Sequence, residues 1–321
     1  MTMLVKGSCR SKLIAVGCSL ISGILLSQMQ AYSDDSGPTV TIVPRLPRGS
    51  ARAKTAIRVD VNLVLIPVMV TDPYQRVVSG LRKQDFRLFE DGVQQNISQF
   101  FNGEEPVSIG IVFDASNSMH NKIAQSRQAI REVLNLSLPG DEFFLLKFSD
   151  RPESVCAFTT NVHEIEDGLE SIQPGGWTSL YDAIYVGISH LKHANLGRKV
   201  LLVLSDGGDN DSRYTEREMK ELVKESDVRI FAISVFEKSP SLNSIAEESG
   251  GRAFRVRNLN ELPDLAAKLS SEIHSEYVLG YSPTNRERDG KYRQVKVELL
   301  PPQDVPRPST SWKHGYYSPV E

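Results

Sequence analysis

The chain has 321 residues, of which 40% are hydrophobic and 24% charged, and its formal net charge is −3. This composition is typical of a folded, soluble protein, and the length fits about two domains. Three basic residues lie within residues 1–31, which hold no acid, so the rest of the chain carries a net charge of −6. A mildly acidic protein lacks the basic face that nucleic-acid binding requires, so we expect no nucleic-acid partner.

The N-terminus has the order of segments found in a secretory signal. A basic stretch precedes the apolar run Leu13 to Leu26, and residues 27–31 then end in Ala31. The pattern predicts a signal peptide over residues 1–31 and a secreted, periplasmic or cell-surface protein. The alternative is an uncleaved segment that tethers the chain to a membrane. The apolar run has about 14 residues, however, and spanning a bilayer takes roughly 20.

Only one cysteine remains beyond the predicted signal. Cys9 and Cys18 lie within residues 1–31, so cleavage would leave Cys156 alone and exclude an intramolecular disulfide. A reactive thiol is one interpretation of Cys156, but no activating base is evident for it. We therefore interpret it as a small residue on a strand.

Short strand patterns follow a linker. Residues 32–54 are rich in Ser, Pro, Asp and Arg, which is typical of a flexible linker. Residues 55–104 then predict a small β module with strand patterns at Ile57–Val70, Val77–Leu81, Asp85–Glu90 and Gln95–Phe101. The pair Asp91-Gly92 is a strong hairpin signal and predicts that the last two patterns pair with each other.

Strands alternate with helices over residues 105–272. Apolar runs predict strands at Val107–Phe113, Glu142–Phe148, Lys199–Leu204, Val228–Phe236 and Arg252–Val256, with Ser154–Thr159 as a hairpin edge. Helical spacing predicts helices at Asn121–Leu136, His163–Ile172, Ser179–His193, Thr215–Ser226, Ser241–Ser249 and Leu259–His274. Such alternation predicts an α/β fold with a doubly wound, mostly parallel sheet.

Residues 273–321 return to strand patterns. Tyr277–Tyr281 and Tyr292–Leu299 predict strands, and Trp312–Tyr317 follows the Pro-rich residues 301–308. We interpret this part as a C-terminal β extension. Because neither flank has enough strands to be stable alone, we expect the two flanks to form one small β domain.

Side chains with oxygen atoms gather where two predicted core strands end. Asp114, Ser116 and Ser118 directly follow one strand, Asp206 follows another, and Thr178 lies in a loop before a predicted helix. Open α/β sheets bind ligands at the carboxyl ends of their strands. Since oxygen-only side chains suit a hard cation such as Mg²⁺, the sequence predicts a metal site here.

The order Asp-x-Ser-x-Ser, a distant Thr and a strand-terminal Asp resembles the metal-ion-dependent adhesion site of von Willebrand factor type A (VWFA) domains. The resemblance covers roughly residues 107–271. It implies a Rossmann-like domain in which the first and fourth strands are neighbours, which brings Asp114 and Asp206 together beneath the Thr178 loop. The turn from Glu90 to Gln95 resembles a segment that precedes this domain in a group of secreted bacterial proteins with flanking β segments.

The resemblance also implies how such a site works. The cofactor would be Mg²⁺, with Mn²⁺ or Ca²⁺ as alternatives, and one coordination position would stay open for an acidic residue of a protein partner. The metal ligands would be Asp114, Ser116, Ser118, Thr178 and Asp206. Trp177 and His120 flank the motif and are candidates for the rim that selects the partner. For Trp177, packing on the sheet edge is the alternative.

Other polar clusters have a functional and a plain interpretation. Asp209-Asn-Asp211 offers oxygen atoms for a second cation, but such runs are more often solvated loops. His190 and His193 lie one helical turn apart, yet a zinc site needs a third ligand and none is evident. We expect Asp182 to stabilise the Thr178 loop without binding the ion itself.

We favour a secreted, metal-dependent adhesion or interaction module that is not an enzyme. One alternative is a structural scaffold with a stabilising metal. The other is a Mg²⁺-dependent phosphoryl-transfer hydrolase, but Ser116 stands where such enzymes place a second carboxylate, and no Walker loop or Gly-x-Ser-x-Gly elbow is present. These patterns carry no signal for the oligomeric state, and a membrane is expected only if the N-terminal segment is retained.

Overall fold

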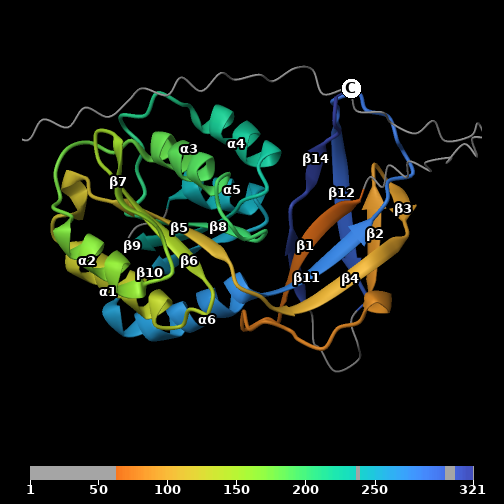
Figure 1. Cartoon of the computed structure of the whole chain (residues 1–321), viewed down its shortest axis with the longest axis horizontal. Helices are drawn as coiled ribbons and strands as arrows, with labels where there is room; N and C mark the ends of the chain where they lie inside the picture. Colours follow the sequence, from red (N-terminus) through yellow and green to blue (C-terminus); the bar gives the residue numbers. More distant parts are fainter. Residues whose placement is uncertain (1–62, 236–238, 301–307, 321) are drawn as a thin grey trace, which may run out of the picture. The chain divides into compact units, whose positions relative to one another are not determined.

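The computed structural model of this chain describes residues 63–235, 239–300 and 308–320 (Figure 1). All of them belong to one unit, residues 59–321. The predicted signal peptide, the linker and the first part of the strand pattern Ile57–Val70 lie outside the described residues. No helix in the described part of the chain is long and apolar enough to cross a membrane.

A six-stranded sheet confirms the predicted α/β fold. Its strands lie in the order β10-β9-β8-β5-β6-β7, and all pair in parallel except β7, which is antiparallel to β6. The strands are β5 (Ser108–Asp114), β6 (Glu142–Phe148), β7 (Pro152–Thr159), β8 (Lys199–Ser205), β9 (Arg229–Val235) and β10 (Arg252–Val256). The first and fourth strands, β5 and β8, are neighbours, and the strand order reverses between them. This switch point is where a doubly wound sheet opens a crevice for ligands.

Helices cover both faces of this sheet (Figure 1). The first face carries α1 (Ile123–Leu134), α2 (Val162–Ser171) and α6 (Leu262–His274), whose apolar side chains share one core with alternate residues of β5, such as Ile111 and Phe113. The second face carries α3 (Leu180–Leu191), α4 (Glu216–Glu225) and α5 (Pro240–Glu248) around Val112. The capping box predicted for Thr215 and Glu218 is present at the start of α4.

Two glycines allow close packing on one face of the sheet. A Cβ atom on Gly110 of β5 would lie 2.3 Å from the Phe144 ring. A Cβ atom on Gly187 of α3 would lie 2.6 Å from the Leu201 side chain, so α3 approaches β8 more closely than a larger residue would allow. The loop that carries Thr178 directly precedes α3.

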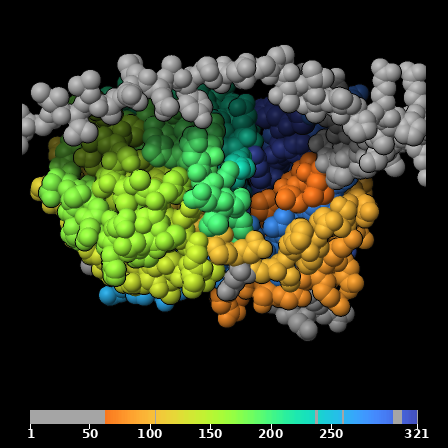
Figure 2. Space-filling model, viewed as in Figure 1, coloured from red at the N-terminus to blue at the C-terminus, as the bar shows by residue number. Residues whose placement is uncertain are grey.

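The two flanks form two further sheets, as expected. Their orders are β13-β1-β11-β4 and β14-β12-β2-β3, so each sheet mixes strands from both ends of the described chain. The space-filling view shows the N-terminal flank in orange beside the C-terminal flank in blue (Figure 2). The strands are β1 (Val64–Thr71), β2 (Phe86–Glu90), β3 (Val93–Gln95), β4 (Ile97–Glu104), β11 (Ser275–Tyr281), β12 (Tyr292–Leu299), β13 (Ser309–Trp312) and β14 (Gly315–Tyr317). The exact domain boundaries stay predictions.

Two details of the N-terminal flank differ from the sequence-based expectation. Val77–Leu81 is not a strand and contributes only an isolated bridge between Val77 and Thr71. The hairpin at Asp91-Gly92 has positive φ angles of 48° and 81°, but its returning strand is the short β3 and not Gln95–Phe101. The chain crosses to the other sheet at Asn96, and β4 pairs with β11 instead. Periodicity locates strands but does not show which partner they take.

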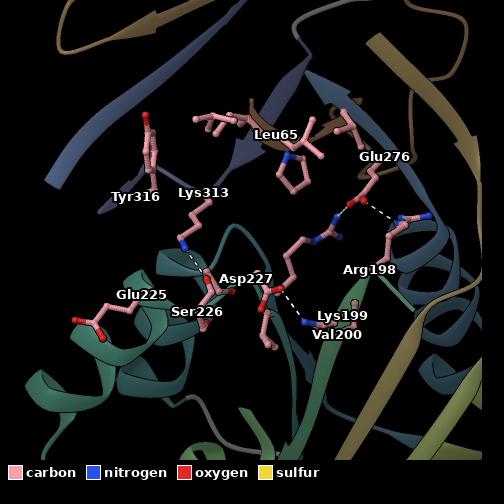
Figure 3. A pocket seen from close by; sticks show the side chains of 18 of the residues that line it. Leu65, Arg198, Lys199, Val200, Glu225, Ser226, Asp227, Glu276, Lys313 and Tyr316 are labelled. Carbon is pink, nitrogen blue, oxygen red and sulfur yellow. Dashed lines mark hydrogen bonds and ion pairs between the residues drawn. The ribbon is translucent and has the colours of Figure 1, made fainter. Parts of the chain in front are cut away.

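Buried ion pairs attach β11 to the amino ends of β8 and β9. The Glu276 carboxylate is paired with the guanidinium groups of Arg198 and Arg229 (Figure 3). Arg198 also donates to the carbonyl oxygens of Ile273 and His274 at the end of α6. Beside these pairs lies a cavity of about 540 Å³, lined by Leu65, Val200 and Tyr316 among others. It lies at the opposite end of the strands from the predicted metal site.

A buried carboxylate connects three strands of the β domain. Glu90 on β2 is 2% exposed, and its Oε2 atom accepts hydrogen bonds from the hydroxyls of Tyr281 on β11 (2.6 Å) and Tyr316 on β14 (2.8 Å). These bonds join the N-terminal flank to the C-terminal flank across both sheets.

Replacing Tyr281 with Phe should therefore destabilise the protein by about 1–3 kcal/mol, because a buried acceptor loses a donor. Tyr317→Phe is the matched control. Its hydroxyl bonds the exposed Glu221, and we expect a change within about 0.5 kcal/mol. Urea unfolding of both variants measures the difference, and equal stabilities would show that the Glu90 cluster does not hold the flanks together.

Candidate metal centre

Asp114 ends β5 with a fully buried carboxylate. Its Oδ1 atom accepts a hydrogen bond from the Ser116 backbone N–H (2.8 Å), and its Oδ2 atom accepts one from the Ser205 hydroxyl (2.6 Å). Burial raises the pKa of Asp114, while the hydrogen bonds from Ser116 and Ser205 oppose that rise. Two donors from different strand ends thus hold the carboxylate in one orientation.

The two serines of the motif present their hydroxyls together. Ser116 precedes the short 3₁₀ turn Asn117–Met119, and the buried Met119 side chain anchors that turn in the core. The turn brings the Oγ atoms of Ser116 and Ser118 to within 3.0 Å of each other. Ser116 is buried whereas Ser118 is exposed, so the pair extends from Asp114 toward solvent.

The loop before α3 is hydrogen-bonded to the Asp114 loop. Gly175 N–H donates to the Ala115 carbonyl oxygen (2.7 Å), and Asn117 N–H donates to the Gly176 carbonyl oxygen (3.0 Å). Gly176 has a φ of 82°, a conformation that favours glycine. These bonds join the loop that carries Thr178, which is 5% exposed, to the loop that carries the two serines.

The loop after β8 completes the arrangement. Asp206 directly follows Ser205 and is 8% exposed, and its charge contributes to the raised pKa of Asp114. The Asn210 side chain accepts a hydrogen bond from Thr178 N–H (2.8 Å), and the Thr178 carbonyl oxygen accepts from the backbone N–H of Asn210. The structure therefore brings the three predicted loops together at the carboxyl ends of β5 and β8.

Sequence reasoning missed two residues of this centre. Ser205 was included in no site because it continues an apolar strand, yet its hydroxyl holds Asp114. Lys122, just before α1, extends its ammonium to 2.7 Å from Asp206 Oδ2. The only sequence signal that either residue belongs to the site is its proximity to a motif. Ser205 directly precedes Asp206, and Lys122 lies four residues after Ser118.

The two candidate rim residues are both exposed. The Trp177 side chain is 65% exposed, so it does not pack on the sheet edge as the alternative supposed. Its backbone N–H donates to the Asp150 carboxylate (2.7 Å), which fixes the loop that presents the indole. His120 is exposed one residue after the 3₁₀ turn.

The other polar clusters act within the fold. Asp209 Oδ1 accepts from the Ser212 hydroxyl (2.5 Å), and Asp182 Oδ1 accepts from the backbone N–H groups of Arg213 and Tyr214, so Asp182 holds that segment and not the Thr178 loop. The described residues contain no group of three or more His, Cys, Asp or Glu side chains that could hold a metal ion. The Asp209 carboxylate is taken up by the Ser212 hydroxyl, and the His190 ring packs against Phe144, so both side chains make contacts within the fold. Cys156 lies on strand β7, as predicted. Burial raises the pKa of its half-buried thiol, which disfavours the reactive thiolate.

The donor set fits a hard dication. It consists of two buried carboxylates and three hydroxyls, with no nitrogen or sulfur, and oxygen ligands are those that Mg²⁺ and Ca²⁺ prefer. Two buried carboxylates repel each other, and the Lys122 ammonium offsets only one of their two negative charges, so the centre can still attract a cation.

Comparisons with known proteins agree with this fold. This chain is 28% identical to inter-alpha-trypsin inhibitor heavy chain H4 of Homo sapiens over 170 residues, which are 47% of this chain and 18% of that protein. It is 34% identical to the heavy chain H4 of Bos taurus over 116 residues, which are 32% of this chain and 13% of that protein. The chain thus spans less than a fifth of the length of these relatives.

Two solved structures are among those to which the chain is similar. One is proximal thread matrix protein 1 from the mussel byssus, in a form with a zinc-occupied MIDAS motif (TM-score 0.46, 19% identity, 56% of this chain, 49% of that chain). The other is BatB from Bacteroides thetaiotaomicron (TM-score 0.44, 16% identity, 52% and 98%). The model of the von Willebrand factor type A domain matches residues 108–268, from the first strand of the central sheet into its last helix. The chain therefore belongs to the von Willebrand factor type A domain family.

Proposed function

We propose that this chain is a metal-dependent protein-binding module that holds an acidic residue of its partner through a dication. The ligands proposed for the ion are Asp114, Ser116, Ser118, Thr178 and Asp206. The observation that supports the proposal most strongly is the hydrogen bonding of the three loops that carry these residues, at the switch point between β5 and β8. Such a centre is built before any partner arrives.

The charge of the ligand set explains why a partner carboxylate would bind. Asp114 and Asp206 offset only the double charge of the ion when both are ionised, and the hydroxyls of the other three ligands add none. The bound ion would supply an electrophilic position at the protein surface. The exposed Ser118 lies on the solvent side of the set, which leaves room for a ligand from outside. We propose Mg²⁺ as the ion, with Mn²⁺ or Ca²⁺ as alternatives.

Trp177 and His120 are proposed as the rim of the binding surface. A large aromatic side chain on a fixed loop gives a partner much apolar contact at little entropic cost, and Trp is enriched among residues that dominate binding energy. The hydrogen bond from Trp177 N–H to Asp150 supplies that fixed position. The partner therefore should combine a carboxylate with an apolar side chain.

An enzymatic role has less support in the geometry. A phosphoryl-transfer hydrolase with Asp114 as nucleophile would place a second carboxylate two residues further along the chain, as its general acid. Ser116, two residues on, supplies no acid. We therefore propose that the module binds and does not catalyse. A scaffold that only uses the metal for stability is separated from this proposal by the chelation experiment below.

The first test concerns the metal ligands. A ligand that binds only the folded state stabilises it by about 2.7 kcal/mol at a hundredfold excess over its dissociation constant. Millimolar Mg²⁺ should therefore raise the melting temperature of the wild type and leave that of Asp114→Ala unchanged. Thr178→Ala keeps both carboxylates, so it should retain part of the shift. An identical shift in all three proteins would rule out this ligand set.

The second test separates binding from scaffolding. Partner capture from extracts of the native host should disappear with EDTA and in Asp114→Ala, while circular dichroism shows a folded protein in each case. If chelation removes the metal and capture continues, the chain is a metal-independent scaffold.

Ser205 provides a test of the support behind the ligands. Removing its hydroxyl leaves Asp114 Oδ2 without a donor, and loss of a group that orients a metal ligand typically lowers metal affinity by about 10–100-fold. We expect Ser205→Ala to show that loss in a calorimetric Mg²⁺ titration. Ser234 pairs with Ser205 in the neighbouring strand β9 and is also buried, so Ser234→Ala is the matched control. Equal losses in the two variants would indicate a general packing effect.

Localisation outside the cytoplasm is also a proposal. It is supported by the signal-like residues 1–31, and membership of the secreted bacterial group stays a prediction alongside it. N-terminal sequencing of the protein from its producing cell should give a chain that starts near Tyr32. A retained Met1 would instead support a membrane-tethered form.

A further inference from the structure

A lysine shares one of the two carboxylates of the proposed metal centre. Lys122 Nζ lies 2.7 Å from Asp206 Oδ2, and the two side chains are only 19% and 9% exposed. Within the described parts of the chain, Asp206 is the sole carboxylate paired with this ammonium group. The pair therefore lies largely out of water, where charges interact more strongly than at the surface.

The backbone around Lys122 is fixed, so its proximity is built into the fold. Lys122 N–H donates to the Met119 carbonyl oxygen (2.8 Å), and the Lys122 carbonyl oxygen accepts from Ser126 N–H (2.9 Å) in the first turn of α1. The same segment carries the Ser116 and Ser118 hydroxyls at its start. The ammonium group and the hydroxyl ligands thus reach the centre from one rigid turn, although no two of them are adjacent in sequence.

Lys122 and a bound dication would compete for the same carboxylate. When Asp114 and Asp206 are ionised, the two carboxylates carry a charge of −2. The Lys122 ammonium reduces the net charge that an ion would meet to −1. An ion that takes Asp206 must either share its oxygens with the ammonium group or displace it. In both cases the lysine weakens the attraction between the carboxylates and the ion.

We propose that Lys122 is a built-in competitor of the metal ion at Asp206, which lowers the affinity of the centre and stabilises the protein when the ion is removed. The inference rests on the proposed metal-binding function. It predicts two opposite effects of one side chain. Without Lys122 the metal-free protein keeps two buried carboxylates and no counter-charge, and with metal bound the same carboxylates hold the ion more strongly.

The test uses calorimetric titration with Mg²⁺ and thermal melting in EDTA and in Mg²⁺. Lys122→Met keeps most of the apolar stem and removes the charge. A neighbouring charge shifts the proton affinity of a carboxylate by about 10- to 1,000-fold, so we expect the Mg²⁺ affinity of Lys122→Met to rise at least about tenfold. Its melting temperature should fall in EDTA, and the increase produced by Mg²⁺ should exceed that of the wild type.

Three further variants make the result specific. Lys122→Arg keeps the positive charge and should bind Mg²⁺ like the wild type. Lys199→Met removes a lysine that pairs with Asp227 at the other end of β8, and it should leave Mg²⁺ affinity unchanged. Lys122→Gln removes the charge but keeps a hydrogen-bond donor for Asp206, so it carries the test if Lys122→Met does not fold.

The outcomes separate this inference from the proposed function. If the wild type binds Mg²⁺ and a folded, uncharged Lys122 variant binds with equal or lower affinity, Lys122 is not a competitor, and the metal site itself stands. If neither the wild type nor the variants bind Mg²⁺, Mn²⁺ or Ca²⁺, the proposed metal centre is wrong, and the inference is wrong with it. If Lys122 is purely structural, its substitution should lower the melting temperature equally with and without metal, and that result would contradict the inference.

Discussion

The parallel pairing of β5 with β8 is the constraint on which the proposed site depends. It brings the ends of two strands that are about 90 residues apart into adjacent positions, so that the Ser205 hydroxyl reaches the Asp114 carboxylate. The strand order reverses at this pair, which is the position at which doubly wound sheets bind ligands. The loop that carries Thr178 is attached to this edge by backbone hydrogen bonds to Ala115 and Asn117.

The centre joins high burial with access to solvent. Asp114, Ser116, Thr178 and Asp206 are buried, which limits the screening of the two carboxylates by water, whereas Ser118 and Trp177 are exposed. A buried anionic pair is unfavourable by itself, and the fold offsets it with hydrogen bonds to Asp114 and an ammonium group at Asp206.

The β domain is attached at the other end of the same strands. Glu276 pairs with Arg198 and Arg229 at the amino ends of β8 and β9, whereas the ligand-bearing loops lie at the carboxyl ends. The two flanks close on each other through shared sheets and through the Glu90 cluster. In the described residues, these ion pairs therefore attach the flanks at the end of the sheet opposite to the proposed binding face.

The sequence by itself determined the local features. Apolar runs and helical spacing located the strands and helices of the α/β region, because these periodicities follow from backbone geometry. The motif residues from Asp114 to Asp206 were recognised because each directly follows or precedes such an element. Contacts between distant residues were decided only by the tertiary structure. The donation from Ser205 to Asp114, the approach of Lys122 to Asp206 and the crossing of β4 to β11 each depend on where a second, remote element lies. No local pattern encodes that position, since a serine at a strand end or a lysine before a helix has the same sequence signal whatever it faces.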